Sequence, residues 1–357
     1  MIGKGLRWFG TILLFALVAL SFAPTLVPPF LDRIYYAGPV SDHFDGRRFF
    51  NPGSHDPPRM DPGRMLGRWL STERPAWPDH VPVQPSVPPR SVAGEEMRVT
   101  WIGHSTVLVQ VAGLNILTDP TWSERASPFS FMGPTRVRAP GVRFEDLPHI
   151  DLVLVSHNHW DHMDLPTLRR LRERDRPLIV TSLGNDTLLR GDGIESVARD
   201  WGGRVQMQGG AEVVVLRNQH WGSRWGTDRN RALWSAFAVR TSHGNIFFGG
   251  DTGWGDGSWV SEAARAGPYR LAIIPIGAYL PRDIMQNSHM GPEEALRAFN
   301  VLNPVMALGV HWGTFQLAFE RIDDPPRTLA ALIQRQGLPP GRFVTTEVGR
   351  PFSVPAR

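Results

Sequence analysis

The densest group of metal-binding side chains in the sequence is the run His157-Asn158-His159-Trp160-Asp161-His162. Imidazole nitrogens and carboxylate oxygens are ligands that suit a borderline divalent cation such as zinc. In an extended stretch, His157, His159 and Asp161 would project from one side of the chain, because side chains alternate with period two. His162 would point the other way. One short segment could therefore supply two adjacent metal positions, and a surface loop that merely carries histidines is the alternative.

The segment before this run predicts the element that positions it. Residues 151–156 (DLVLVS) are short, apolar and rich in valine, which indicates a buried strand. Pro166 and a charged helical pattern come after the run. We therefore expect residues 157–162 in the loop at the carboxyl end of a strand, where a rigid scaffold often carries catalytic or binding residues.

The 157–162 run resembles the H-x-H-x-D-H signature of the metallo-β-lactamase fold. His220, Asp251 and His311 follow downstream in the order of that family's remaining ligands. Three flanking segments are most similar to the phospholipases D that hydrolyse N-acylphosphatidylethanolamine and to their bacterial relatives: residues 101–106 (WIGHST), 274–279 (IPIGAY) and 289–295 (HMGPEEA). The resemblance covers about residues 42–352, which is nearly everything after the N-terminal apolar segment.

The resemblance implies a pair of zinc ions. Seven side chains would hold them: His157, His159 and His220 on the first ion, Asp161, His162 and His311 on the second, and Asp251 between the two. Each ion then keeps an open position, which is typical of catalytic rather than structural sites. Two such ions make water nucleophilic at neutral pH and stabilise charge on a phosphate. Iron and manganese also suit these ligands.

Taken singly, the outlying residues allow simpler interpretations. Asp251 could cap a turn, and His220 and His311 could be buried histidines satisfied by hydrogen bonds. Asp119 follows a predicted strand, so it could hold the second ring nitrogen of a ligand histidine, or else form an Asx turn before proline. His104 could lie near the metals or serve only in a turn.

Two residues are candidates for contact with the substrate. In the resembled phospholipase a histidine that matches His289 binds substrate at the metal centre. Here His289 would orient the phosphate or protonate the leaving alkoxide beside the catalytic Asp161 and Asp251, and a capping role is the alternative. Trp160 matches an aromatic substrate contact that is a tyrosine in that family, so the indole keeps the apolar face but lacks the hydroxyl.

The elements expected around these motifs define the fold class. From residue 96 onward the pattern is one of short strands and turns. We expect strands at about 98–102, 106–111, 115–118, 211–217, 234–242, 245–249, 271–276 and 305–310, and helices at about 165–175, 258–266, 292–302 and 326–336. This alternation indicates an α/β fold in which two packed sheets carry helices outside, a four-layer α/β/β/α sandwich, and the resemblance implies the same architecture.

Two segments precede this predicted hydrolase domain of residues 96–357. Residues 8–31 carry no charge, and Trp8 to Val27 has about the length of a membrane-spanning helix, roughly 20 residues. We therefore expect residues 1–31 to be a membrane anchor, with a cleaved signal peptide as the alternative. Residues 32–95 are rich in proline, which disfavours long helices, but they include Phe44, Phe49, Phe50, Trp69 and Trp77. We expect them to form an irregular arm that packs over the catalytic domain.

Composition excludes several classes of function. The chain has 357 residues, of which 41% are hydrophobic, enough for a core but too few for a polytopic membrane protein. Its 38 basic and 34 acidic residues give a net charge of +4. Nearly all of the basic residues are arginine, and either an anionic lipid surface as partner or a GC-rich genome would explain this preference. No dense basic run suggests nucleic-acid binding. The absence of cysteine excludes disulfides and cysteine-bearing zinc sites.

These observations lead to one main hypothesis and two alternatives. The main hypothesis is a dizinc hydrolase that acts on a phospholipid and releases an N-acylethanolamine and phosphatidic acid from N-acylphosphatidylethanolamine. It would be anchored in a bacterial inner membrane with its catalytic domain in the periplasm, because basic residues precede the anchor; signal cleavage would leave it periplasmic. A lactonase or other esterase needs the same metals, and a metal-binding envelope protein without turnover is the third hypothesis. Homodimer formation stays open.

Overall fold

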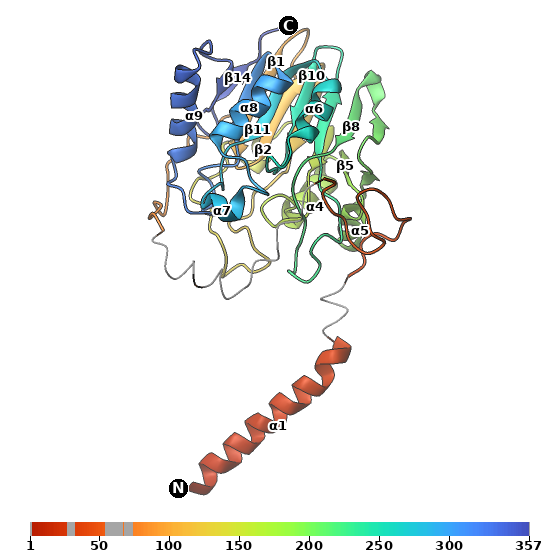
Figure 1. The fold of residues 1–357 in the computed structure, drawn as a ribbon, viewed down its shortest axis with the longest axis vertical. Helices are drawn as coiled ribbons and strands as arrows, with labels where there is room; N and C mark the ends of the chain where they lie inside the picture. Colours follow the sequence, from red (N-terminus) through yellow and green to blue (C-terminus); the bar gives the residue numbers. More distant parts are fainter. Residues whose placement is uncertain (1, 27–32, 54–66, 68–73, 357) are drawn as a thin grey trace.

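The computed structural model describes residues 2–26, 33–53, 67 and 74–356, and its body consists of two seven-stranded sheets (Figure 1). The first sheet contains, in spatial order, β14 (Pro351–Ser353), β1 (Met97–Gly103), β2 (Thr106–Val111), β3 (Leu114–Thr118), β4 (Leu152–Val155), β5 (Leu178–Ser182) and β6 (Val197–Arg199). The second contains β13 (Phe343–Val344), β12 (Met306–Val310), β11 (Tyr269–Pro275), β10 (Asn245–Phe248), β9 (Ala236–Arg240), β8 (Glu212–Leu216) and β7 (Arg204–Gln206).

Helices cover the outer face of each sheet (Figure 1). On the first sheet these are α4 (Leu165–Arg174) and α5 (Asn185–Gly191). On the second they are α6 (Ser258–Arg265), α8 (Pro292–Leu302) and α9 (Asp324–Arg335). The short α7 (Arg282–Met285) lies between β11 and α8, and single 3₁₀ turns occupy Phe144–Asp146 and Gln208–Gly210. The expected sandwich of two sheets with outer helices is confirmed.

The central strand β4 shows why the sequence before the 157–162 loop is so apolar. β3 and β5 flank β4 in parallel, and all four of its residues are buried. Leu152 and Leu154 belong to the core between the sheets, whereas Val153 and Val155 belong to the core beneath α4 and α5. A strand covered on both faces needs apolar side chains at every position, so β4 is a rigid base for the loop that follows it.

The strands that carry the candidate ligands have one direction within each sheet. In the first sheet β1, β3 and β4 are parallel to one another, since β2 is antiparallel to both β1 and β3. In the second sheet β8, β10, β11 and β12 share one direction, since β9 is antiparallel to β8 and β10. Because these strands share one direction, the loops that follow them all leave the sheet at the same end of the strands.

The described parts of the arm contact both halves of the catalytic domain: Val81 and Ser86 donate to the carbonyls of Val137 and Gly141, and Phe49 donates to that of Asn230. In residues 33–53 and 74–95, which with residue 67 are the described parts of the arm, the backbone makes isolated bridges but no helix or strand. Phe44 and Phe49 are buried in a cluster with Leu233 and Trp234. Trp69 lies outside the described residues. The division into three parts at residues 31 and 95 stays a prediction.

The N-terminal apolar segment forms the helix α1 (Ile2–Leu26). Its side chains from Trp8 to Leu20 are solvent-exposed; Phe15, for example, is 72% exposed. Val27, the predicted end of the membrane span, lies outside the described residues. Among the residues that the structure describes, no helix has both the length and the apolarity needed to cross a bilayer. The structure therefore does not support the predicted membrane-spanning segment.

Candidate metal centre

The predicted ligands converge where the loops of the two sheets meet. The 157–162 loop follows β4, His220 follows β8, Asp251 follows β10, and His311 follows β12. Five of the seven ligand residues are buried, and the other two, His159 and Asp161, are partly buried. Loops from both halves of the sandwich thus form one centre that is largely shielded from solvent.

Three histidines form the first group of ligand atoms. Nε2 of His157 lies 2.8 Å from Nδ1 of His159, and Nε2 of His220 lies 3.3 Å from the same Nδ1. These three residues are the set assigned above to the first ion. Imidazole nitrogens that face one another at such distances suit a shared cation.

Asp161, His162 and His311 form the second group. Nε2 of His162 lies 3.2 Å from Oδ2 of Asp161, and Nε2 of His311 lies 3.5 Å from it. His104 belongs to the same group, with its Nε2 at 2.8 Å from Oδ2 of Asp161. His104 is therefore placed to orient the Asp161 carboxylate.

Asp251 connects the two groups. Its Oδ2 lies 3.1 Å from Nε2 of His162, 3.1 Å from Nε2 of His311 and 3.9 Å from Nε2 of His220. A carboxylate between two imidazole groups can bind a cation on each side. This position agrees with the bridging role expected for Asp251.

Asp119 lies behind the ligands and holds two of them. Its Oδ2 accepts a hydrogen bond from Nδ1 of His162 at 2.6 Å and another from Oγ of Ser156 at 2.6 Å. Because Ser156 Oγ donates to Asp119, it accepts from Nδ1 of His157, 2.8 Å away. Both imidazoles thus keep the proton on Nδ1 and direct the Nε2 lone pair toward the centre, which is how a carboxylate prepares a histidine to bind a metal.

Strained backbone occurs at the same place. His104 and His311 have φ angles of 53° and 64°, and the His311 N–H donates to the His104 carbonyl at 3.0 Å. Asp119 has a φ of 32°. Positive φ is uncommon outside glycine, and such residues cluster at functional sites where the surrounding structure holds them. Gly250 (φ 57°) lets the β10 loop approach, because a Cβ there would lie 2.7 Å from Cβ of Ser156.

Burial and charge set the protonation of the centre. Burial lowers the pKa of His159 to about 3, so this imidazole is neutral and offers a lone pair at pH 7. Burial opposes charge on His311 too, but the Asp251 and Asp161 carboxylates outweigh it and raise the pKa of His311 to about 9. Burial would raise the pKa of Asp251, yet His162 and His311 hold it well below its usual range. The carboxylates thus stabilise positive charge between them, as a cation would require.

Several buried atoms at the centre fit a cation directly. Among the described residues, the buried atoms at the centre that lack a hydrogen-bond partner include Nε2 of His162, Nε2 of His311 and Oδ1 of Asp251. A buried polar atom without a partner is costly, and metal coordination would satisfy each of these atoms.

The two predicted substrate contacts differ in their surroundings. His289 comes from the segment after β11, and its Nδ1 lies 3.8 Å from Oδ2 of Asp251, close enough to reach an anion bound at the centre. Trp160 uses its indole N–H in a 2.7 Å hydrogen bond to the carbonyl of Arg224. The indole N–H is therefore already used within the protein and is not free to bind a substrate.

Two residues that support His220 had no signal in the sequence. The carbonyl of Ser288 accepts a hydrogen bond from Nδ1 of His220 at 2.8 Å. Nδ2 of Asn51, in the arm, donates to the His220 carbonyl at 2.8 Å, and Trp234 donates to Oδ1 of Asn51 at 3.2 Å. These residues lie 68 and 169 positions from His220, so no local pattern joins them to it.

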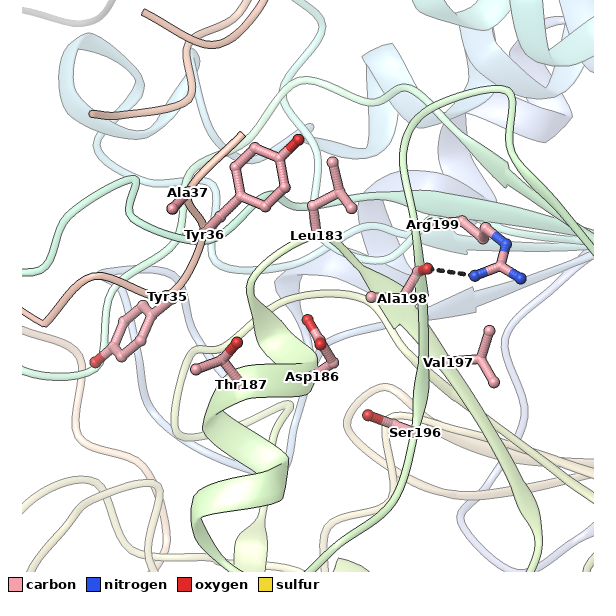
Figure 2. A pocket seen from close by; sticks show the side chains of 10 residues that line it. All are labelled: Tyr35, Tyr36, Ala37, Leu183, Asp186, Thr187, Ser196, Val197, Ala198 and Arg199. Atoms are coloured by element: carbon pink, nitrogen blue, oxygen red, sulfur yellow. Dashed lines mark hydrogen bonds between the residues drawn. The ribbon is translucent and has the colours of Figure 1, made fainter. Parts of the chain in front are cut away.

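A cavity of about 540 Å³ is lined by residues from another region and by none of the predicted ligands (Figure 2). Its lining comes from residues 35–37 of the arm, from Leu183, Asp186 and Thr187, and from residues 196–199 around β6. Figure 2 shows the hydroxyl of Tyr35 turned away from the other labelled side chains. This cavity is distinct from the metal centre.

Comparisons with known proteins show which family and which fold this chain shares. A family model described as the β-lactamase superfamily domain matches residues 114–312. The N-acyl-phosphatidylethanolamine-hydrolyzing phospholipase D 1 of Caenorhabditis elegans is 32% identical over 350 residues, which cover 91% of this chain and 97% of that protein. The mitochondrial enzyme of the same name from Saccharomyces cerevisiae is 34% identical over 245 residues, 67% of this chain and 52% of that protein. Igni18, a metallo hydrolase from Ignicoccus hospitalis, aligns with a TM-score of 0.57 and 19% identity over 73% of this chain and 100% of its own.

The sandwich and its centre of histidine and aspartate define a metal-dependent hydrolase of the metallo-β-lactamase class. The chain belongs to the β-lactamase superfamily, and within it to the homologues of the N-acyl-phosphatidylethanolamine-hydrolyzing phospholipases D. The family expected from the motifs is confirmed.

Proposed function

We propose that this chain is a phospholipase D-type phosphodiesterase that uses two zinc ions to hydrolyse N-acylphosphatidylethanolamine. Water adds to phosphorus, the bond from phosphorus to the ethanolamine oxygen breaks, and the products are an N-acylethanolamine and phosphatidic acid. The observation that carries the proposal is the pair of ligand groups joined by Asp251, whose Oδ2 lies 3.1 Å from Nε2 of His162 and of His311 in the second group and 3.9 Å from Nε2 of His220 in the first. The Caenorhabditis elegans homologue, named for this reaction and matched over 97% of its length, supports the choice of substrate.

The residues of the centre have complementary roles in this reaction. Two divalent cations would lower the pKa of water and neutralise the phosphate oxygens, which suits an in-line displacement at phosphorus. Asp161 and Asp251 would bind them together with five histidines: His157, His159, His162, His220 and His311. His104 orients Asp161, and Asp119 orients His162. His289, at the edge of the group, would hold a phosphate oxygen or pass a proton to the leaving alkoxide.

An exposed apolar loop beside the centre supports a lipid substrate. The loop begins at Thr121, whose Oγ1 donates to the carbonyl of Asp161 at 3.1 Å, and returns at Arg136, which donates to the carbonyl of Thr121 at 2.9 Å. Between these ends, Phe131 and Met132 are 76% and 55% exposed. We propose that these side chains contact the bilayer that contains the substrate. The location at the periplasmic face of a bacterial inner membrane stays a prediction.

The bond that is cleaved can be tested with labelled water. The zinc-loaded full-length protein is incubated with N-acylphosphatidylethanolamine in H₂¹⁸O, and both products are analysed by mass spectrometry. Attack at phosphorus places ¹⁸O in phosphatidic acid and leaves the N-acylethanolamine unlabelled. Asp161→Asn should abolish turnover, because it removes a ligand charge, whereas Asp175→Asn, far from the centre, should not.

Other results would overturn the proposal in distinct ways. Hydrolysis of a lactone without any phosphodiester cleavage would keep the metal centre and replace the substrate class with an ester. A metal-loaded protein that is inert on every phosphodiester and ester offered would favour a binding protein without turnover.

A further inference from the structure

Arg224 reaches from one ligand-bearing loop into the other. It lies four residues after His220, in the segment between β8 and β9. Its Nη1 donates to the carbonyl of Met163 at 2.8 Å and to the carbonyl of Asn158 at 3.1 Å. These two carbonyls flank His159–His162, which contains three of the seven ligands. One guanidinium nitrogen therefore connects both ends of that loop to the segment that carries His220.

The surroundings of Arg224 are unusual for a cation. The residue is only 6% exposed; the carboxylates of Asp164 and Asp228 favour its charge, but neither forms an ion pair with it in the part of the chain that the structure describes. Its guanidinium carbon lies 3.4 Å from the ring centroid of Trp160, and the Trp160 indole returns a hydrogen bond to the Arg224 carbonyl. Burial lowers the pKa of Arg224 to about 10, so the side chain stays charged at pH 7. A buried charge without a paired carboxylate costs stability, and a function that requires the charge would explain its presence.

The backbone around Arg224 is itself held firmly. The carboxylate of Asp228 accepts hydrogen bonds from the N–H groups of Arg224 and Trp225, at 3.0 and 2.9 Å, and from Oγ of Ser223 at 2.6 Å. The hydroxyl of Tyr35, in the arm, donates to the other oxygen of Asp228 at 2.8 Å. This is the hydroxyl that points away from the cavity in Figure 2. The arm thus contributes to the support of the turn that presents Arg224.

We propose that Arg224 is a positioning residue that ties together the two ligand-bearing loops and thereby sets the affinity of the centre for its metals. The inference rests on the metal centre of the proposed function but not on its substrate. Residues 157–162 form turns and irregular backbone rather than a regular element, and within the loop only the His159 carbonyl accepts from its own backbone, so the carbonyls of Asn158 and Met163 depend on Arg224 as donor. A planar guanidinium that stacks on Trp160 fixes both carbonyls with little remaining freedom. Loss of this contact would leave His159 and Asp161 free to move relative to His220.

Substitutions at Arg224 and at a matched arginine separate positioning from general stability. Arg224→Met removes the donors and keeps the apolar stem, and Arg224→Lys keeps a charge and donors without the planar fork. Arg270 is the control, because it is 4% exposed and also donates to backbone carbonyls, those of His243, Val354 and Pro355, but it lies at the start of β11, away from the ligands. For each full-length variant, zinc affinity is measured by competition with a chromophoric chelator, and the visible absorption of the cobalt-substituted protein reports ligand geometry.

The expected pattern is specific to a positioning role. Arg224→Met should weaken zinc binding about 10- to 100-fold, the usual effect of losing a group that orients metal ligands, and should alter the cobalt spectrum. Arg224→Lys should recover part of the affinity, and Arg270→Met should lower the unfolding temperature without changing either readout. Zinc affinity within twofold of wild type in Arg224→Lys and Arg224→Met, or equal losses in Arg224→Met and Arg270→Met, would overturn the proposal. If Arg224→Met does not fold, an unchanged affinity and spectrum in Arg224→Lys overturn it, and a weakened affinity supports it. Wild-type protein that binds zinc but cleaves no lipid would refute the proposed substrate and leave this inference intact.

Discussion

Replacement of Asp119 by asparagine tests whether hydrogen bonds behind the ligands set metal affinity. In the wild type, Oδ2 of Asp119 accepts from Nδ1 of His162 at 2.6 Å, which leaves Nε2 to face the centre. Asparagine has nearly the same shape and tolerates the φ of 32° at this position, so backbone strain is unchanged. If the asparagine NH₂ takes the place of Oδ2, two hydrogen-bond donors face each other: this NH₂ and the Nδ1–H of His162. The imidazole then favours the tautomer with its proton on Nε2, which cannot bind a metal.

The expected loss of zinc affinity follows from the hydrogen bond between Asp119 and His162 that the substitution removes. A hydrogen bond to a charged group contributes about 1.5–3 kcal/mol, which corresponds to roughly a 10- to 150-fold change in an equilibrium constant. Asp119→Asn should therefore weaken zinc binding by about 10- to 100-fold, the range seen when such supporting groups are removed. Asparagine keeps the volume of this buried side chain, so the metal-free variant should stay folded.

The assay is a zinc titration of the metal-free protein in competition with a chelator, with thermal unfolding measured in parallel. Asp175→Asn is the matched control, because the Asp175 side chain is 6% exposed and accepts from the N–H of Ile150, at the end of the sheet opposite the ligands. The control should keep its zinc affinity. Equal zinc affinity in Asp119→Asn and wild type would show that Asp119 does not orient His162, and an equal drop in both variants would point to general destabilisation.

Three further predictions concern the arm, the apolar loop and the core. Burial would lower the pKa of His43, but hydrogen bonds to Asp200 and Asp42 outweigh it and raise that pKa above 6.5. The stabilisation that His43 provides should thus be complete below about pH 6.5 and lost as the pH rises through the folded-state pKa. The prediction is wrong if the unfolding temperatures of His43→Gln and of the wild type depend on pH in the same way. Phe131→Ser should weaken binding to phospholipid vesicles by roughly 10-fold or more, from the 1.5–3 kcal/mol that burial of a phenylalanine contributes, yet leave activity on detergent-dispersed substrate unchanged; equal activity losses in both assays would refute a bilayer contact. Leu154→Ala, in the core between the sheets, should lower the free energy of unfolding by about 2–5 kcal/mol in urea titrations, whereas Val301→Ala, 44% exposed, should change it by less than about 0.5 kcal/mol.

The sequence predicts the parts of the fold whose local pattern is strong. The strand expected at 305–310 is β12 (Met306–Val310), and the helix expected at 292–302 is α8 (Pro292–Leu302). β5, α5 and the edge strands β6, β7, β13 and β14 were not predicted. The edge strands contain only two or three residues and are partly exposed, so their conformation follows from pairing with a neighbour rather than from their own composition.

For the metal centre too, the residues close together in sequence could be predicted, whereas the contacts between distant segments could not. Four candidate ligands lie within six consecutive residues, so the sequence alone places them together, and the fold brings His220, Asp251 and His311 to them. The supporting contacts of Asn51, Arg224 and Tyr35 could not be predicted. Each joins segments that are distant in sequence through a backbone carbonyl or a single carboxylate, and such contacts leave no periodic or compositional trace.

The contact between Tyr35 and Asp228 has a consequence for the order of folding during synthesis. The two residues are 193 positions apart, and Phe44 and Phe49 likewise pack against Leu233 and Trp234. At about 5–20 residues per second, the ribosome needs roughly 10–40 s to make the second partner after the first has emerged. For that interval the aromatic residues of the arm have no native surface to cover them. This first part of the arm, although it is made early, can therefore complete its packing only after residue 234 has been synthesised.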